Sequence, residues 1–318
     1  MTEQKLDPQA QQVCDLIVAS GRPPIETLTP PEARKAYLAS KPILQPDPPE
    51  VAEVLSLEAK GPAGPIPLRL YRGQGVPKDK PQPALIYYHG GGWVIGDLES
   101  HDQACRALAN AVPCIVVAVD YRLAPEHKFP AAAEDAIAAA SWIAAEAPRL
   151  GIDVKRVAVG GDSAGGNLAA VVSLNARDHG GPHIVHQFLI YPGTDMRMTF
   201  PSVERHAMQL PLTQAAMRWF VAHYLRSPAD ASDWRASPLQ AASFKGLPPA
   251  LVVTAGFDPL CDEGEAYAKA LAAAGVAVKH ERFAGQIHGF LTMGRIIADS
   301  GRLIAMGAAA LREAFALR

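Results

Sequence analysis

The chain has 318 residues, of which 49% are hydrophobic and 19% are charged, and this composition excludes an intrinsically disordered protein. Its 30 Lys and Arg residues nearly balance 32 Asp and Glu residues, and no basic run that would suit a phosphate backbone is present, so nucleic acid is not an expected partner. No window has the roughly 18 consecutive apolar residues of a membrane span. The N-terminus lacks an apolar signal core, so a cytoplasmic protein without membrane insertion is expected.

Apolar runs and helical periodicities alternate along most of the chain. Two helices are predicted in a proline-rich leader, at residues 8–20 and 31–40, and one more at 213–225 in a second irregular region. The predicted strands are residues 51–57, 66–71, 84–88, 115–120, 156–160, 187–191, 250–255 and 278–283. The helices predicted between and after them lie near residues 101–111, 131–147, 163–176, 263–274 and 296–315.

This alternation predicts an α/β protein with a mostly parallel, doubly wound, eight-stranded sheet. Inner strands such as residues 115–119 are apolar without alternation, as expected where helices cover both faces of a parallel sheet. The Gly-Pro-rich connection at residues 61–65 predicts an antiparallel edge. Residues 46–193 and 238–318 are therefore expected to form the core, and residues 1–45 and 194–237 a helical cap or lid.

A Gly-x-Ser-x-Gly motif, centred on Ser163, follows the predicted strand at 156–160 and precedes a helix. This is the setting of a nucleophile elbow, in which a tight turn exposes the serine hydroxyl at a helix N-terminus. Only glycine avoids a Cβ clash two residues to either side of such a serine. The motif arises by chance in about one chain in ten of this length, and a glycine-rich turn with a solvated serine is the alternative interpretation.

The strand at 84–88 is followed by His89 and three glycines. Such a loop lets backbone N–H groups point into a site where the tetrahedral intermediate of acyl transfer carries an oxyanion. The expected donors are the N–H groups of Gly91, Gly92 and Ala164. His89 is expected to orient the loop by hydrogen bonds rather than to act as a base.

The catalytic partners of Ser163 are expected after it, in the order acid and then histidine. His288 follows the last predicted strand, whereas His280 lies inside that strand, so His288 is the predicted base. Asp258 follows the strand at 250–255 and is the predicted acid that orients His288. Asp262 is the alternative, but it is expected to begin the next helix.

Together these segments resemble the hormone-sensitive lipase family, specifically its bacterial esterases. The motifs that carry the resemblance are His89-Gly90-Gly91-Gly92-Trp93, Tyr121-Arg122-Leu123-Ala124-Pro125-Glu126-His127, Gly161-Asp162-Ser163-Ala164-Gly165-Gly166-Asn167 and Asp258-Pro259-Leu260.

The resemblance covers about residues 50–310 and implies an α/β-hydrolase fold with a helical cap. It also implies an esterase that acts on short- to medium-chain carboxylic esters without a cofactor or a metal ion. The same residues carry over, with Ser163, Asp258 and His288 as the triad and Gly91, Gly92 and Ala164 as the oxyanion hole.

Three other functions are the alternatives to an esterase. A receptor on this fold is expected to lack His288, an amidase would share the triad, and an interfacial lipase would need a basic amphipathic helix that the sequence does not show. Glu126 and His127 could suggest acid–base chemistry, but a structural turn is favoured. His179, His183 and His186 could suggest a metal site, but surface and strand positions are favoured.

Some features of the sequence do not point to a single role. The C-terminal helix is expected either to pack on the sheet or to support a homodimer. The four cysteines are predicted to be free thiols. Pocket lining and cap packing are equally compatible with one aromatic and apolar set: Trp93, Met208, Leu210, Trp219, Phe220 and Tyr224.

Overall fold

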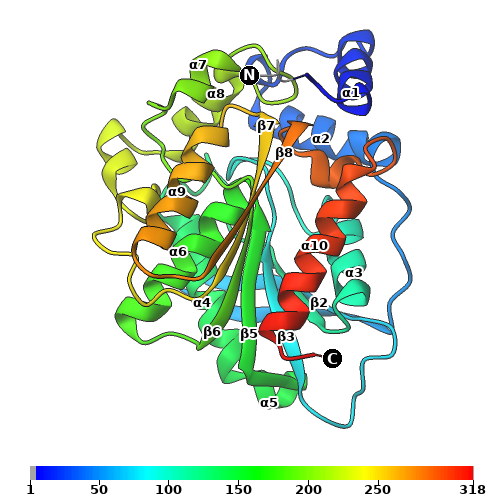
Figure 1. Ribbon diagram of the computed structural model, residues 1–318, viewed down its shortest axis with the longest axis vertical. Coiled ribbons are helices and arrows are strands. Elements are labelled where there is room, and N and C mark those ends of the chain that lie inside the picture. Colours follow the sequence, from blue (N-terminus) through cyan, green and yellow to red (C-terminus); the bar gives the residue numbers. More distant parts are fainter. Residues whose placement is uncertain (1–4, 318) are drawn as a thin grey trace.

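The computed structural model describes residues 5–317 and contains an eight-stranded sheet with helices on both faces (Figure 1). The strand order is β1-β2-β4-β3-β5-β6-β7-β8. The strands are β1 (Glu53–Gly61), β2 (Gly64–Arg72), β3 (Gln82–Tyr88), β4 (Ile115–Val119), β5 (Ile152–Asp162), β6 (Ile184–Ile190), β7 (Ala250–Phe257) and β8 (Val278–Ile287). All eight predicted strands are confirmed.

Antiparallel pairing is confined to one edge of the sheet. β2 pairs antiparallel with both β1 and β4, and every other neighbouring pair is parallel. The antiparallel edge predicted from the Gly-Pro-rich connection is therefore confirmed. Because the strands from β3 to β8 are parallel, their carboxyl ends meet at one edge, which is where ligands bind in open α/β sheets.

The two core layers follow from the alternation of side chains along each strand. In β3, Ala84, Ile86 and Tyr88 pack in the layer under α4 (Ala131–Ala145) and α6 (Ala164–His179). Leu85 and Tyr87 point the other way, into the layer under α3 (Asp102–Ala111) and α10 (Asp299–Ala314). Both faces of β3 are buried, which explains its unbroken apolar run.

The C-terminal helix α10 packs on the sheet, which was one of its two predicted roles. Leu303 and Leu311 are fully buried in the layer that contains Leu85 and Tyr87, and Met306 is partly buried there. α9 (Cys261–Ala273) packs against β7, and the short α5 (Ala147–Leu150) precedes β5. All four cysteines are buried free thiols, as predicted.

Two segments far apart in the sequence lie over the carboxyl ends of the strands (Figure 1). One contains α1 (Pro8–Ala19) and α2 (Pro30–Leu44), and the other contains α7 (Pro201–Arg205) and α8 (Gln214–Tyr224). Cys14 on α1 joins them, because its thiol lies 3.6 Å from the carbonyl oxygen of Leu210 and 3.5 Å from Nε2 of Gln209. We call these two segments together the cap.

Several predicted boundaries differ from the structure, among them the ends of α2 and β8. α2 continues through Pro42 to Leu44 rather than ending at Ser40. A proline so near the helix end removes one hydrogen bond, and the last turn is closed by the Gln45 N–H, which donates to the Lys41 carbonyl oxygen at 2.9 Å. β8 runs to Ile287 rather than Phe283, because Ile287 still pairs with Phe257 of β7 across a local irregularity.

The helices α5 and α7 were not predicted. Both are five residues or shorter, which is too short for a helical periodicity to stand out in the sequence.

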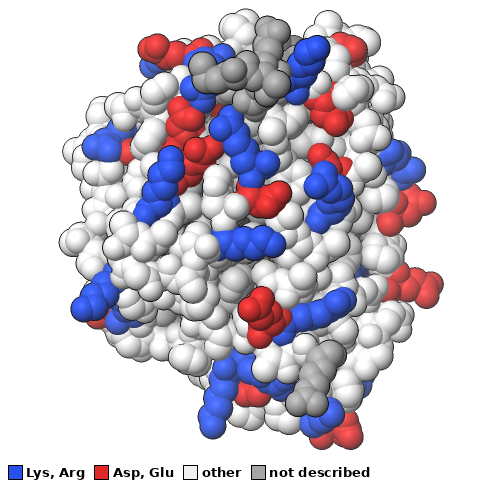
Figure 2. All heavy atoms as spheres, in the orientation of Figure 1, with Lys and Arg blue, Asp and Glu red and all other residues white. Residues whose placement is uncertain are grey.

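Acidic and basic side chains are interspersed over the face of the molecule that Figure 2 shows. Of the helices within residues 5–317, none has the length and apolarity needed to cross a membrane.

Candidate active site

Ser163 occupies a sharp turn between β5 and α6. Its φ is 56°, a strained value for a residue with a side chain, and its N–H donates to the Ile190 carbonyl oxygen at 2.8 Å. A Cβ atom at Gly161 would lie 2.3 Å from the Tyr88 carbonyl oxygen, and one at Gly165 would lie 1.8 Å from it. Neither position could accept a side chain, so the predicted need for glycine on both sides of Ser163 is confirmed.

The structure brings Ser163, His288 and Asp258 into one hydrogen-bonded row. Nε2 of His288 lies 2.9 Å from Oγ of Ser163, and Nδ1 of His288 lies 2.7 Å from Oδ2 of Asp258. Asp258 is fully buried, and its other oxygen accepts from the Leu260 N–H at 2.8 Å. The ring of His288 is thereby oriented with Nε2 toward the serine hydroxyl.

The two alternative residues lie outside this row. Asp262 pairs with Arg205 at 2.7 Å and accepts from the Ser202 N–H. His280 points from β8 to Thr254, with Nε2 3.0 Å from its hydroxyl oxygen. The four positions that separate Asp258 from Asp262 correspond to about one turn of chain, yet only Asp258 faces the histidine.

The glycines after β3 form a turn beside Ser163, and we call residues 89–96, which contain the predicted oxyanion donors Gly91 and Gly92, the oxyanion loop. Gly91 and Gly92 have φ values of 122° and 56°, and the Gly91 carbonyl oxygen accepts from the N–H groups of Val94 and Ile95. Within residues 5–317, no backbone carbonyl outside the regular elements accepts from the N–H of Gly91, Gly92 or Ala164. These N–H groups are therefore available to a ligand beside the serine.

Asp162 is a member of the site that the sequence reasoning missed. It is buried, and one carboxylate oxygen accepts from the Gly90 N–H at 3.0 Å and from the Tyr87 hydroxyl at 2.8 Å. Burial alone would raise its pKa, but the neighbouring His101 and these hydrogen bonds outweigh that effect and hold the pKa of Asp162 below its usual value. The signal was its place directly before Ser163, where its side chain must turn back toward the oxyanion loop.

His89 has the surroundings of an orienting residue. Its Nδ1 lies 2.7 Å from the Gly90 carbonyl oxygen, its own carbonyl oxygen accepts from the Tyr121 hydroxyl at 2.7 Å, and its ring stacks on Tyr121. Burial lowers the pKa of His89 to about 4, so the ring is neutral at pH 7. A neutral ring that is bonded to its own loop fits the expected orienting role.

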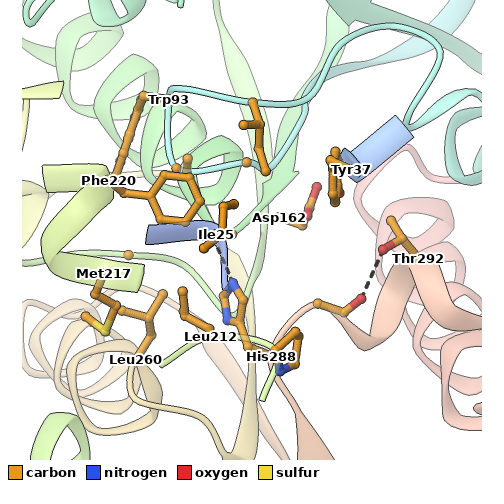
Figure 3. A pocket seen from close by; sticks show the side chains of 18 of the residues that line it. Ile25, Tyr37, Trp93, Asp162, Leu212, Met217, Phe220, Leu260, His288 and Thr292 are labelled. Carbon is orange, nitrogen blue, oxygen red and sulfur yellow. Dashed lines mark hydrogen bonds between the residues drawn. The ribbon is translucent and has the colours of Figure 1, made fainter. Parts of the chain in front are cut away.

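A cavity of about 280 Å³ opens onto Ser163 and His288. Trp93, Met217, Phe220 and Leu260 lie on one side of it, and Tyr37 and Thr292 lie on the other (Figure 3). Its lining comes from both cap segments as well as from the core loops, and it is mostly apolar.

The aromatic and apolar residues that could either line a pocket or pack inside the cap do not all have the same role. Trp93 and Phe220 line the cavity. Tyr224 is buried behind it and stacks on Trp93 with the ring centres 4.5 Å apart, while Trp219 packs against Phe220. Leu210 packs between cap and core, and Met208 is 86% exposed and lines nothing.

Glu126, His179 and His186, for which the sequence favours structural roles, lie in an ion pair or in regular elements. Glu126 forms an ion pair with Arg34 at 2.6 Å. His186 is buried in β6 and His179 ends α6. In the part of the chain that the structure describes, no three His, Cys, Asp or Glu side chains gather in a way that could hold a metal ion.

A hydrogen-bonded row of a serine, a histidine and a buried aspartate at the carboxyl ends of parallel strands is the arrangement of a serine hydrolase. The three residues follow in the chain as serine, aspartate and histidine. A protein-family model described as alpha/beta hydrolase fold matches residues 85–292 of this chain. Carboxylic ester hydrolase LipN of Mycobacterium tuberculosis is 47% identical over 82% of this chain and 70% of its own length. Ethyl acetate hydrolase of Pseudomonas putida is 39% identical over 91% of this chain and 92% of its own.

Solved structures agree with these relatives. An α/β hydrolase from the metagenome of Lake Arreo superposes with a TM-score of 0.95 at 44% identity, covering 99% of this chain and all of the other. An esterase of Pyrobaculum calidifontis gives 0.89 at 40% identity, over 98% of this chain and 100% of its own. The chain therefore belongs to the hormone-sensitive lipase family of esterases within the α/β-hydrolase superfamily, and it is a carboxylic ester hydrolase.

Proposed function

We propose that the protein hydrolyses short- to medium-chain carboxylic esters with Ser163 as nucleophile, His288 as general base and Asp258 as the acid that orients it. The observation that carries this proposal is the hydrogen-bonded row from Ser163 Oγ through both ring nitrogens of His288 to the buried Asp258. The row places the ring nitrogen that takes the proton at hydrogen-bond distance from the hydroxyl that gives it.

The reaction then proceeds in two halves. Ser163 Oγ attacks the ester carbonyl carbon while His288 Nε2 takes the hydroxyl proton, and the carbonyl oxygen becomes an oxyanion that accepts from the N–H groups of Gly91, Gly92 and Ala164. His288 returns the proton to the leaving alcohol as the C–O bond breaks, which leaves an acyl-enzyme. Water, deprotonated by His288, attacks this ester and releases the acid and free Ser163.

The cavity supports a substrate of modest length. Since His288 must protonate the alcohol, we infer that the alcohol lies beside His288 and the acyl chain lies against the apolar wall of Trp93, Met196 and Leu260. A cavity of about 280 Å³ has room for a short or medium acyl group and its alcohol, which supports this substrate range.

We further propose that residues 1–45 and 194–237 act as one cap over a core made of residues 46–193 and 238–318, where residues 1–4 and 318 lie outside the part of the chain that the structure describes. Both cap segments contribute side chains to the cavity, for example Tyr37 and Phe220, which supports a joint role in substrate selection. A cytoplasmic location and a homodimer remain predictions; light scattering on the purified chain tests the second.

Hydrolysis of p-nitrophenyl esters from acetate to palmitate tests the proposal. We expect the wild type to favour the short and medium esters and Ser163→Ala to lose at least 10³-fold in kcat. Ser173→Ala is the matched control, because Ser173 is a buried serine of α6 whose hydroxyl donates to the Ala169 carbonyl oxygen of the same helix, and it should keep full activity. A folded wild type that cleaves p-nitroanilides but no ester would instead indicate an amidase.

A further inference from the structure

The oxyanion loop is held at its first glycine by the core. The Gly90 N–H donates to the buried carboxylate of Asp162 at 3.0 Å. Gly91 and Gly92 follow immediately, and the turn closes when the N–H groups of Val94 and Ile95 donate back to the Gly91 carbonyl oxygen. The two bonds to the Gly91 carbonyl oxygen lie within the loop. They fix the shape of the turn but do not attach its far end to another part of the protein.

The far end is held from the cap. Arg34, on α2, donates from Nε to the Val94 carbonyl oxygen at 2.8 Å. The same guanidinium donates from Nη2 to the Ala124 carbonyl oxygen at 2.9 Å, and the Ala124 N–H donates to the Trp93 carbonyl oxygen at 2.8 Å. One cap side chain therefore ties the oxyanion loop to the neighbouring loop at residues 121–127.

Glu126 keeps the guanidinium in place. Its two oxygens accept from Nη1 and Nη2 of Arg34 at 2.9 and 2.6 Å, a two-pronged contact that fixes the plane of the guanidinium. The hydrogen bond from Arg34 lowers the pKa of Glu126 to about 2, so the carboxylate is charged throughout the working range of an esterase. This gives a role to the Glu126 motif residue that the mechanism leaves unused.

α2 packs against this end of the oxyanion loop through Ala33, which is buried in the same apolar layer as Val94 and Ile95. Beside this contact lies a second cavity of about 300 Å³, lined by Tyr37 and Leu38 of α2 and by Gly96, Asp97 and Ser100. Arg34 lines this cavity and crosses from the helix to the loop. Because apolar packing has no preferred direction, the bond from Arg34 to the Val94 carbonyl oxygen adds the directional contact that orients the loop backbone.

We propose that Arg34 is a positioning residue for the oxyanion hole, acting through Val94 on Gly91 and Gly92, so that docking of the N-terminal cap helix sets the competence of the catalytic centre. The proposal rests on the proposed roles of Gly91 and Gly92. Asp162 and Arg34 hold the two ends of the loop, and the two donors lie between them. Since a misplacement of about 1 Å in a catalytic site costs on the order of 10²-fold, freeing one end should cost about 10- to 100-fold in kcat/KM.

The test compares Arg34→Met and Arg34→Lys with Lys35→Met, the matched control on the same helix, whose exposed side chain faces solvent. Steady-state hydrolysis of p-nitrophenyl butyrate gives kcat and KM, and a trifluoromethyl ketone of the same acyl length probes the oxyanion hole, because its serine adduct carries the same negative oxygen. We expect Arg34→Met to lose 10- to 100-fold in kcat/KM, mostly in kcat, and to lose ketone affinity by the same factor. Arg34→Lys keeps the positive charge but not the planar guanidinium, so its kcat/KM and ketone affinity should lie between those of the wild type and Arg34→Met. Lys35→Met should match the wild type.

The proposal is overturned if Arg34→Met retains wild-type kcat/KM, or if it loses activity while ketone affinity is unchanged, since a merely structural role would move stability and not the oxyanion site. If Arg34→Met does not fold, Arg34→Lys decides by the same two measurements. A wild type without esterase activity would refute the proposed function itself, whereas an active wild type with an equally active Arg34→Met refutes only the positioning role.

Discussion

Gly193 lies in the wall of the cavity that we assign to the acyl chain. It follows β6, and its N–H lies 3.3 Å from the Ser163 carbonyl oxygen, beside the nucleophile. A Cβ atom there would lie 3.7 Å from Trp93, 3.8 Å from Leu260 and 3.8 Å from Met196, all of which line the cavity. These are ordinary van der Waals distances, so a Cβ atom fits without displacing its neighbours and occupies space that an acyl chain would otherwise fill.

The size of the effect follows from the apolar surface that the acyl chain loses. Each buried methylene contributes about 0.8 kcal/mol, or about fourfold in kcat/KM. Gly193→Ala displaces about one methylene and should lower the hexanoate-to-acetate ratio of kcat/KM about fourfold. Gly193→Val displaces about two, which is about 1.6 kcal/mol and about 15-fold.

The assay uses two series of esters on the wild type and both variants. In one series the acyl chain grows from acetate to octanoate on a fixed alcohol, and in the other the alcohol grows on a fixed acetate. We expect the graded loss in the acyl series only, with acetate turnover and melting temperature near those of the wild type. A loss that follows the alcohol series instead, or an unchanged acyl ratio in Gly193→Val, would refute the assignment of this wall to the acyl chain.

Three further outcomes are expected. Asp258→Asn should lower kcat about 10³- to 10⁴-fold with little change in KM, since the neutral amide no longer favours the tautomer and charge that His288 needs; equal loss in both parameters would count against this. Gly91→Ala should lose at least 10²-fold in kcat, because its Cβ would lie 2.1 Å from the Ile95 carbonyl oxygen, whereas Gly301→Ala on α10, with open space around it, should keep activity and gain about 0.5 kcal/mol in urea unfolding. Burial, and then the charge of Asp97, raise the pKa of Asp120 to about 6 from 3.8; the folded state therefore holds this proton more tightly than the unfolded chain, and wild-type stability falls as pH rises from 3.8 to about 6 and is level above that. Asp120→Asn should thus gain about 1–2 kcal/mol over the wild type at about pH 8 and almost nothing at about pH 3, after allowance for a side chain that is 33% exposed, and a gain independent of pH would contradict this origin.

The strands and the nucleophile turn could be read from the sequence because their causes are local. The unbroken apolar run of β3 reflects burial on both faces, and the glycines around Ser163 reflect backbone atoms that come within 2.5 Å of where a side chain would begin. The end of β8 was misjudged, since Gly285 suggested a loop and only pairing with β7 keeps that segment extended.

The sequence by itself determined the fold class, the eight strands and the residues that meet at the row of Ser163, Asp258 and His288, because a parallel sheet brings its strand ends to one edge wherever they stand in the chain. Only the tertiary structure decided which cap side chains reach that edge. Arg34 meets Val94 across 60 positions and Glu126 across 92, and no periodicity records such a contact. Those contacts depend on where the cap helices come to rest on the core, which is settled by packing between segments and not by any one of them.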